Sequence, residues 1–253
     1  MVLFHIERGS GTPLLLLHGF PFDHTIWEGV IKELEKGIRV IAPDLRGHGH
    51  SMITKSDSSI TDMAADIIEL MDQLKIKEAV IAGHSMGGYI TLEIARNYPK
   101  RVSGLVLISS HIFADSLEKK QSRFGDIDRI AQHGAYAVLA KLPNMLTDDT
   151  DARSFCRDAV ARMDSTGAMG ALYAMANRTA SEDVWEALHI PTMVIAGSND
   201  RLIPLEQSRG FAGLPKNNAL KEINSVGHMP MLEAPDKVAM ILVKFMNDMR
   251  RNT

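Results

Sequence analysis

Ser85 lies in the pentapeptide G-H-S-M-G at residues 83–87, and its surroundings indicate a catalytic nucleophile. The short apolar run Ala79–Ala82 before it has the composition of a strand, and apolar residues at helical spacing follow it over Gly88–Ala95. A serine on a sharp strand-to-helix turn holds its hydroxyl clear of the backbone, open to a base and a substrate. The flanking glycines suit such a turn because a Cβ there would collide with neighbouring backbone. The alternative is an ordinary glycine-rich turn whose serine caps the helix.

A serine hydroxyl becomes nucleophilic when a base accepts its proton, so a catalytic serine needs a histidine and a carboxylate that orients it. His228 follows a late predicted strand and lies in a loop just before the last helix. Asp200 follows the predicted strand Met193–Ala196 through a short turn. Because parallel strands end at one edge of a sheet, Ser85, Asp200 and His228 are predicted to lie together as nucleophile, acid and base.

Other interpretations of the acid and the base stay open at this point. Asp200 is also explained as a solvated turn or helix-cap aspartate, and His228 as an exposed loop histidine. Asp115 is a second candidate for the acid, although the strand before it ends in Ile108-Ser109-Ser110-His111 without a carboxylate close by.

An attacked carbonyl becomes an oxyanion, which needs preorganised N–H donors. We expect one donor to be the backbone N–H of Met86, directly after the nucleophile. We expect the second to be the backbone N–H of Phe20, in the loop His18-Gly19-Phe20-Pro21 that follows the apolar strand Leu14–Leu17. The alternative for this loop is a structural turn in which Phe20 only packs.

The elements around these residues alternate between strands and helices. Apolar runs predict strands at residues 2–7, 14–17, 39–42, 79–82, 105–108, 192–196 and 219–223. Apolar residues at helical spacing predict helices at residues 26–34, 60–74, 88–95 and 235–249. Continuous apolar strands between helices are typical of an α/β fold, with a mostly parallel central sheet covered by helices on both faces.

From residue 112 to residue 188 the sequence predicts no strand, and several helices are expected, among them Ile127–Leu142, Ala152–Met163 and Met169–Ala176. An insertion at the carboxyl edge of the strands lies near the crevice in which α/β sheets bind ligands. We therefore predict a core of residues 1–111 and 189–253, with residues 112–188 as a helical lid (cap). Some of its small or flexible apolar side chains are expected to face the pocket, from the set Ala131, Ala135, Ala137, Ala140, Met145, Met163, Met169 and Met175.

The composition of the 253-residue chain is that of a soluble globular protein, with 45% hydrophobic residues and a formal net charge of −3. This weak negative charge argues against a nucleic-acid partner. No apolar run approaches the roughly 18 residues that span a bilayer, and the first residues lack the pattern of a signal peptide. Cys156 is the only cysteine, so no intrachain disulfide can form. We expect a cytoplasmic protein, and the sequence carries no signal for a particular oligomeric state.

Five motifs of this chain occur in the order found in one known family. They are His18-Gly19-Phe20-Pro21, the segment Asp44–Ser51, the elbow at residues 83–88, the turn Gly197–Asp200, and Gly227-His228-Met229-Pro230. Together they resemble the α/β-hydrolase superfamily, specifically its lid-bearing bacterial serine esterase and enol-lactonase-like branch. The resemblance covers the whole chain except the predicted lid. It implies a triad of Ser85, His228 and Asp200, no metal and no organic cofactor.

The resemblance also implies structural roles for several polar residues near the site. His48 and His50 suggest a metal pair by their spacing, but the resemblance makes their segment a structural loop. Asp44 and Arg46 are interpreted as a pair that fixes this loop. Two further histidines are expected to be structural. His84 should point away from the site and support the elbow, and His18 should brace the oxyanion loop.

The function predicted from the sequence is that of a serine hydrolase, which cleaves carboxylic esters through an acyl-enzyme. We expect small to medium, mainly uncharged acyl groups, because no basic cluster stands out as a clamp. A single basic residue of the lid would also clamp a charged acyl group if its side chain faced inward. The candidates are Lys141, Arg153, Arg157 and Arg162. One alternative is a lactonase or C–C bond hydrolase with the same triad. The other is a ligand sensor that keeps the triad and signals through a protein partner.

Overall fold

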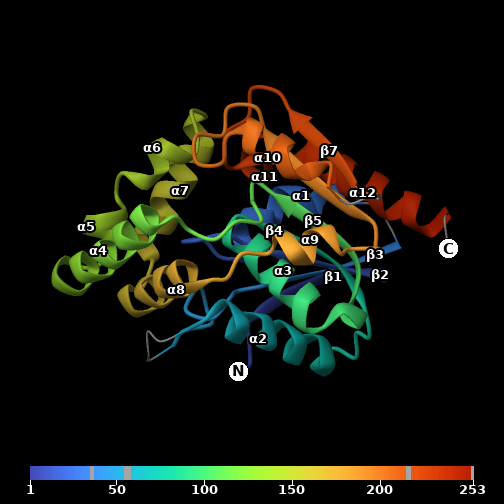
Figure 1. Cartoon of the computed structure of the whole chain (residues 1–253), viewed down its shortest axis with the longest axis horizontal. Helices are drawn as coiled ribbons and strands as arrows, with labels where there is room; N and C mark the ends of the chain where they lie inside the picture. Colours follow the sequence, from blue (N-terminus) through green and yellow to red (C-terminus); the bar gives the residue numbers. More distant parts are fainter. Residues whose placement is uncertain (35–36, 54–57, 215–217, 252–253) are drawn as a thin grey trace.

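A computed structural model of the chain describes residues 1–34, 37–53, 58–214 and 218–251 (Figure 1). A seven-stranded sheet forms its centre, with the strands in the order β1-β3-β2-β4-β5-β6-β7. Their bounds are β1 (His5–Gly9), β2 (Gly11–Leu17), β3 (Gly37–Pro43), β4 (Ala79–His84), β5 (Val102–Ile108), β6 (Thr192–Gly197) and β7 (Asn218–Ile223). Only β1 is antiparallel to its neighbour, β3, so the predicted mostly parallel α/β sheet is confirmed.

Helices cover both faces of this sheet (Figure 1). Outside the long segment between β5 and β6 they are η1 (His24–Trp27), α1 (Glu28–Glu33), α2 (Ile60–Gln73), α3 (Met86–Asn97), η2 (Pro99–Arg101), α10 (Leu205–Ala212), α11 (Pro230–Glu233) and α12 (Pro235–Arg251). Successive side chains of a strand face opposite ways. Leu14 and Leu16 of β2 therefore pack with α1 and α12, while Leu15 and Leu17 pack with α2 and α3.

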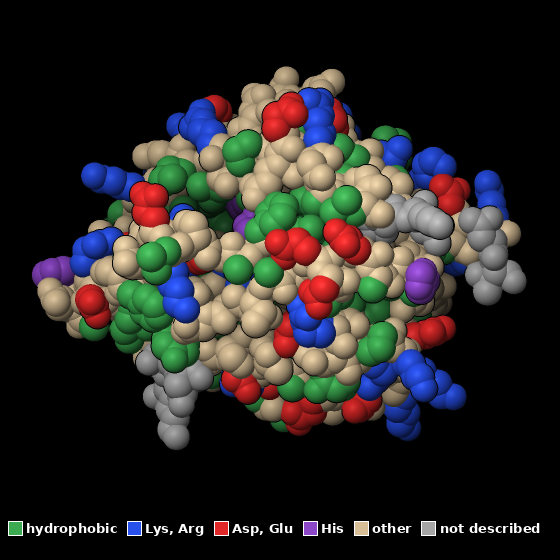
Figure 2. All heavy atoms as spheres, in the orientation of Figure 1, with side chains coloured by type: hydrophobic (Ala, Val, Ile, Leu, Met, Phe, Trp, Pro, Cys, Tyr) green, Lys and Arg blue, Asp and Glu red, His purple; other side chains and the backbone are tan. Residues whose placement is uncertain are grey.

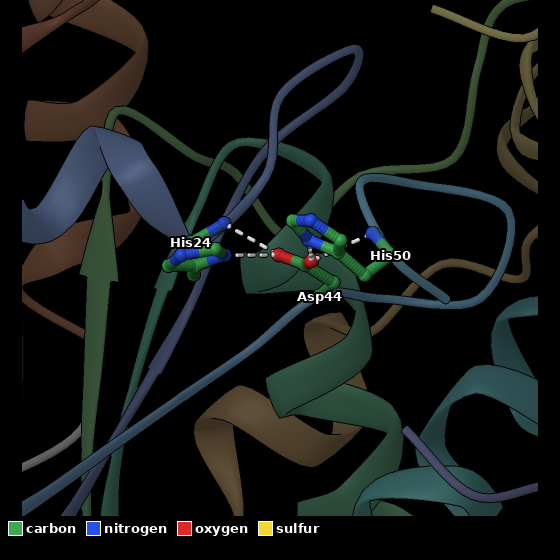
Figure 3. Close-up of side chains that lie close together, drawn as sticks. All are labelled: His24, Asp44 and His50. Carbon is green, nitrogen blue, oxygen red and sulfur yellow. Dashed lines mark hydrogen bonds and ion pairs between the residues drawn. The ribbon is translucent and has the colours of Figure 1, made fainter. Parts of the chain in front are cut away.

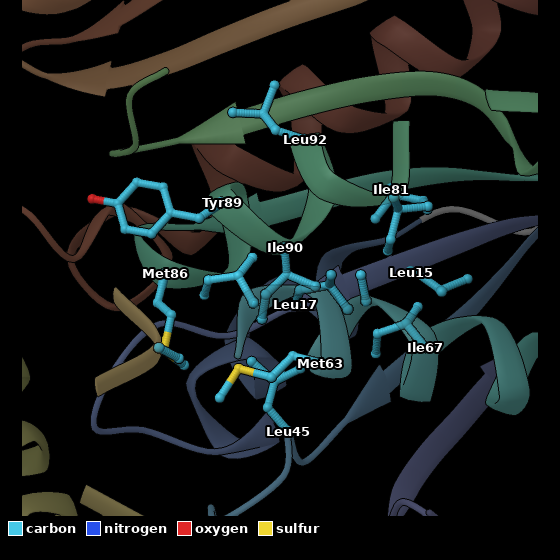
Figure 4. Close-up of a cluster of buried hydrophobic side chains, with 14 of the residues drawn as sticks. Leu15, Leu17, Leu45, Met63, Ile67, Ile81, Met86, Tyr89, Ile90 and Leu92 are labelled. Carbon is cyan, nitrogen blue, oxygen red and sulfur yellow. The ribbon is translucent and has the colours of Figure 1, made fainter. Parts of the chain in front are cut away.

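The helix α2 shows how the sequence starts and orients an element against the sheet. Ser59 accepts a hydrogen bond from the backbone N–H of Asp62, and the Asp62 carboxylate accepts one from the backbone N–H of Ser59, each at 3.0 Å. This reciprocal cap satisfies two donors that the first turn leaves unpaired. Met63 and Ile67, one turn apart, then lie in the buried cluster that Figure 4 shows around Leu17.

The segment between β5 and β6 is helical, and none of residues 109–191 is in a strand. Its helices are α4 (Leu117–His133), α5 (Ala135–Leu139), α6 (Leu142–Leu146), α7 (Thr150–Arg162), α8 (Ser165–Asn177) and α9 (Glu182–Glu186). The single helix predicted at Ile127–Leu142 is wrong. Gly134 has a φ of +83°, a conformation that favours glycine, and it ends α4 there.

Helices α4 to α8 lie together beside the carboxyl edge of the sheet, at the left of Figure 1, whereas α9 returns to α3. Arg96 of α3 donates to the Asp183 carboxylate of α9 at 2.8 Å. The sequence interpretation missed α10 and α11, which are short and weakly patterned. Among the described residues, no helix is both long enough and apolar enough to cross a membrane.

Candidate active site

Ser85 sits on a strained turn between β4 and α3. Its φ of +49° and ψ of −113° lie outside the regions that a serine ordinarily adopts. Hydrogen bonds on both sides hold this conformation: the Ser85 N–H donates to the Ile108 carbonyl at 3.0 Å, and the Ser110 hydroxyl donates to the Ser85 carbonyl at 2.8 Å. The Ser85 side chain makes no capping bond to α3, so the alternative of a simple helix cap is wrong.

The glycines of the elbow permit this turn because other backbone lies very close to them. A Cβ on Gly83 would lie 2.3 Å from the carbonyl oxygen of Gly87. A Cβ on Gly87 would lie 2.4 Å from the carbonyl oxygen of Leu17 in β2. Either side chain would force the elbow away from the sheet edge and move Ser85 with it.

Asp200 and His228 meet at the carboxyl ends of β6 and β7. The Nδ1 atom of His228 lies 2.8 Å from Oδ2 of Asp200, and both side chains are buried. The other Asp200 oxygen accepts the backbone N–H groups of Leu202 and Ile203 at 2.9 Å each. The alternatives of a solvated turn aspartate and an exposed loop histidine are therefore wrong for these two residues.

The ionisation of Asp200 sets the proton arrangement of the pair. Burial acts to raise the pKa of Asp200, but the His228 imidazole and the two backbone donors hold that pKa below its ordinary value. The carboxylate is therefore an acceptor, and His228 donates to it from Nδ1–H. In the neutral imidazole this leaves Nε2 without a proton and able to accept one.

Ser85 and His228 line the same pocket, whose volume is about 680 Å³. The Ser85 hydroxyl makes no hydrogen bond to His228 or to any other residue that the structure describes. Contacts between nucleophile and base are often loose before a substrate binds. The structure thus joins Asp200 and His228 directly, and it brings Ser85 and His228 to the wall of one pocket.

The pocket lies between the sheet edge and the helices α4 to α8, where Figure 2 shows the surface hollowed. One part of its wall is apolar, with Val138, Leu139, Leu142, Met145, Leu146, Leu202 and Ile203. Another part is polar, with Asp115, Ser116, Lys119, Ser122, Arg123 and Asp126. Of the small and flexible residues expected to face the pocket, Met145 and Met175 line it, and of the four basic residues considered as clamps, Lys141 does.

The two predicted oxyanion donors lie beside the nucleophile. Met86 is the first residue of α3, so its N–H has no partner inside the helix. Phe20 lines the pocket, and a Cβ on Gly19 would lie 3.0 Å from the Ser85 Cβ, so this loop runs against the nucleophile. Neither the Phe20 N–H nor the Met86 N–H meets a backbone acceptor among the described residues.

Two buried histidines support these loops. His18 accepts the Leu45 N–H at Nε2 (2.8 Å) and contacts the Gly19 carbonyl with Nδ1 (3.0 Å), which matches its expected role as a brace of the oxyanion loop. His84 does not line the pocket. It nevertheless contacts His228, since its Nε2–H donates to the His228 carbonyl at 2.9 Å.

Three buried histidines make the free energy of unfolding sensitive to acid. Burial lowers the pKa of His48, His84 and His111 to about 3. Below pH 6.5 the unfolded chain protonates these groups while the folded chain does not, so stability is lost as the pH falls from 6.5 toward 3. In urea unfolding at several pH values, we expect each histidine to contribute a loss of about 1.4 kcal/mol per pH unit in that window.

The variant His84→Gln tests this expectation, with His133→Gln, at an exposed position of α4, as its control. His84→Gln should flatten the slope of unfolding free energy against pH, and His133→Gln should leave it as in the parent. Equal slopes in the parent and in His84→Gln would contradict the assignment.

Asp44 fixes two loops through its contacts with two histidines. Figure 3 shows its carboxylate between His24 and His50: Oδ1 accepts the His24 N–H and Nδ1–H at 2.9 and 2.6 Å, and Oδ2 accepts the corresponding His50 groups at 2.8 and 3.2 Å. Arg46 instead pairs with Asp66 of α2, at 2.6 and 2.9 Å. Asp44 and Arg46 thus both fix this segment, through the partners named here.

His24, Asp44 and His50 are also the one trio in the described ranges whose potential ligand atoms all lie within 4.8 Å of one another. Both Asp44 oxygens already accept backbone N–H groups, so the cluster is explained as a clasp between the loops after β2 and β3. The metal pair that sequence spacing suggested, His48 and His50, does not form in this cluster. His48 is buried elsewhere and contacts the Arg46 carbonyl with Nδ1 at 3.0 Å.

Asp115, the second candidate for the acid, lines the pocket but pairs with cations. It accepts from Arg123 at 2.5 Å and from Arg178 at 2.8 Å. No hydrogen bond joins it to His228 in the described structure. The geometry therefore favours Asp200 over Asp115 as the partner of the histidine.

Comparison with known proteins agrees with this architecture. Residues 12–235 match the family model described as alpha/beta hydrolase fold. A thermophilic esterase from Thermogutta terrifontis, solved with malate bound, superposes with a TM-score of 0.94 at 30% identity, over 98% of this chain and 93% of that one. The enol-lactonase of Burkholderia xenovorans LB400 superposes with a TM-score of 0.88 at 25% identity, over 97% and 96%.

A curated relative is similar over most of its length as well. The 2-hydroxymuconate semialdehyde hydrolase of Pseudomonas sp. (strain CF600) is 27% identical over 257 residues, which cover 95% of this chain and 88% of the relative. The family match spans the elbow, the acid and the histidine. The chain therefore belongs to the alpha/beta hydrolase fold family.

Proposed function

We propose that this protein is a hydrolase that cleaves carboxylic esters through an acyl-enzyme, with Ser85 as nucleophile, His228 as base and Asp200 as the acid that orients it. The observation that carries the proposal is the buried 2.8 Å bond between His228 and Asp200, next to a pocket that also exposes the strained Ser85 elbow. Strained backbone of this kind persists where the surrounding structure holds it, and it clusters at active sites.

The chemistry follows from the proton arrangement. His228 Nε2 takes the Ser85 proton as the Ser85 Oγ attacks the ester carbonyl carbon. The carbonyl oxygen becomes an oxyanion, which the N–H groups of Phe20 and Met86 are placed to bind. His228 then gives its proton to the leaving alkoxide, and the acyl group remains on Ser85. Water, deprotonated by His228, releases the carboxylic acid and restores the serine.

The pocket walls support small to medium, mainly uncharged acyl groups. The apolar part of the wall comes largely from α5 and α6, within the segment 112–188 that we propose as the lid over the site. The Arg123 cation is paired with Asp115, so it is not free to clamp an anionic acyl group. Lys119 and Lys141 are exposed side chains at the pocket rim, where an ionic contact would be screened by solvent.

A lactonase or C–C bond hydrolase with the same triad is the second candidate. The similarity to the Burkholderia enol-lactonase and to the Pseudomonas semialdehyde hydrolase favours it. Hydrolysis of an ester, of a lactone and of a C–C bond all require that the serine or a water molecule attack a carbonyl carbon. The triad alone therefore does not distinguish these reactions. The sensor alternative differs in turnover, since a sensor would bind its ligand and hydrolyse it slowly.

One substrate panel tests these functions. We expect kcat/KM for p-nitrophenyl esters to be highest for short to medium acyl chains between acetate and octanoate, and low for palmitate. The same panel should include a simple lactone, a lactone carrying a carboxylate, and a thioester. A maximum at long chains, or a strong preference for the anionic lactone, would overturn the proposed substrate class and leave the triad standing. A burst of p-nitrophenol release that is not followed by steady turnover would favour the sensor.

A further inference from the structure

Tyr89 places a second polar group beside the nucleophile. It lies in the first turn of α3, four residues after Ser85, and both residues line the same pocket. Tyr89 and His111 line the pocket together with Ser85, although Tyr89 is only 8% exposed. In Figure 4 the Tyr89 hydroxyl points away from the labelled apolar side chains of the core.

The hydrogen bonds of His111 determine which ring nitrogen carries its proton, and therefore which residue donates in its bond to Tyr89. The backbone N–H of Phe113 donates to His111 Nδ1 at 3.1 Å, so Nδ1 carries no proton. Burial lowers the pKa of His111 to about 3, so the ring is neutral and its one proton is on Nε2. Nε2 lies 3.0 Å from the Tyr89 hydroxyl oxygen. His111 is therefore the donor in this bond, and Tyr89 is the acceptor.

The proton of the Tyr89 hydroxyl consequently has no acceptor among the residues that the structure describes. Burial raises the pKa of Tyr89, so the hydroxyl keeps this proton at neutral pH. The guanidinium carbon of Arg178 lies 4.0 Å from the centre of the Tyr89 ring. The positive charge of Arg178 acts against burial by favouring a lower pKa of Tyr89, which makes the O–H a stronger donor than burial alone would leave it.

Arg178 is itself held in place, so this arrangement is built rather than incidental. It is buried and donates to the Asp115 carboxylate at 2.8 Å, to the Met175 carbonyl at 2.7 Å and to the Phe113 carbonyl at 3.0 Å. The segment after β5 thus supplies the acceptors that fix Arg178, and it supplies the histidine that orients Tyr89.

We propose that the Tyr89 hydroxyl donates a hydrogen bond to an oxygen that the substrate carries outside its scissile ester, such as a ketone, ether or hydroxyl oxygen. The inference rests on the proposed function and narrows its substrate class to oxygenated esters. A buried donor without a partner is costly, so an alkyl substrate that covers Tyr89 without offering an acceptor binds less well. Pockets built to bond a substrate oxygen discriminate against analogues that lack it.

The test compares esters of matched length with and without the extra oxygen. On the acyl side these are p-nitrophenyl levulinate and p-nitrophenyl pentanoate, and on the alcohol side methoxyethyl butyrate and butyl butyrate. We expect the parent protein to favour the oxygenated member of at least one pair by about 10- to 100-fold in kcat/KM. In Tyr89→Phe that ratio should fall to near one, because only the hydroxyl is removed.

Tyr136→Phe is the matched control, since Tyr136 is exposed and does not line the pocket; it should keep the parent ratio. His111→Leu removes the group that orients the hydroxyl, so it should lower the ratio too, and it replaces Tyr89→Phe as the test if that variant does not fold. Ratios near one in the parent, or a parent-like ratio in Tyr89→Phe, would overturn the inference while Ser85-dependent hydrolysis stands. Absence of Ser85-dependent hydrolysis of every ester would overturn the proposed function and this inference with it.

Discussion

Ser85→Ala is expected to lower the turnover of the preferred ester by a factor on the order of 10⁶, while the protein folds as before. The loss is large because the acyl group then has no oxygen on which to form the covalent intermediate. The pocket and the two oxyanion N–H groups remain, so substrate binding should persist. Folding should not suffer, since alanine removes only a hydroxyl that makes no hydrogen bond within the described structure.

Labelling identifies the nucleophile independently of any substrate. A fluorophosphonate should add one phosphonyl group to Ser85, and peptide mass spectrometry should find it in the tryptic peptide that contains the elbow. Ser103→Ala, at a serine in β5 that does not line the pocket, serves as the control and should keep both activity and labelling. Labelling at another serine, or a fully active Ser85→Ala protein, would show that the elbow is not catalytic.

The sequence was sufficient to predict the elements that position the site. Apolar runs such as Leu14–Leu17 are buried on both faces, so their hydrophobicity is continuous and easily read. The elbow and the acid each follow such a strand, β4 and β6, while the histidine follows the half-buried strand β7. This local relation is visible without coordinates. The pairing of Asp200 with His228 follows from this relation, and the structure shows it as a hydrogen bond of 2.8 Å.

Other features depend on contacts that sequence spacing does not encode. Asp44 and Arg46 are two residues apart, yet their partners come from η1 and from α2. The end of α4 at Gly134 was missed because apolar residues continue at helical spacing beyond it. Tyr89 reads as one more apolar residue of the elbow helix. Only its distance to His111, and the donor at the other side of that ring, reveal a free hydroxyl proton.

Asp200→Asn is expected to lower turnover by a factor of about 10⁴. The Asp200 carboxylate accepts the proton of His228 Nδ1, which leaves Nε2 free to act as the base. An asparagine in the same place can turn its amide N–H₂ toward Nδ1, because its oxygen can then accept the backbone N–H groups of Leu202 and Ile203. Nδ1 would become the acceptor, the ring proton would move to Nε2, and His228 could no longer accept the proton of Ser85.

The geometry at Asp200 makes the choice between these two amide orientations unequal. Its second oxygen accepts the N–H groups of Leu202 and Ile203, and an amide nitrogen placed there would face two donors. The asparagine oxygen is therefore held by the backbone, and its N–H₂ group is directed at His228. This is the arrangement that enforces the wrong tautomer, so the loss in Asp200→Asn should exceed the loss of a single ordinary hydrogen bond.

Asp115→Asn separates this effect from the removal of any buried carboxylate near the pocket. Asp115 pairs with Arg123 and Arg178 and has no bond to His228, so its variant should lose thermal stability but less than about tenfold in kcat. Steady-state kinetics and thermal unfolding of both variants decide the matter. If Asp115→Asn lost turnover by the larger factor and Asp200→Asn did not, the acid of the triad would be Asp115, and the bond between Asp200 and His228 would serve only to position the loop.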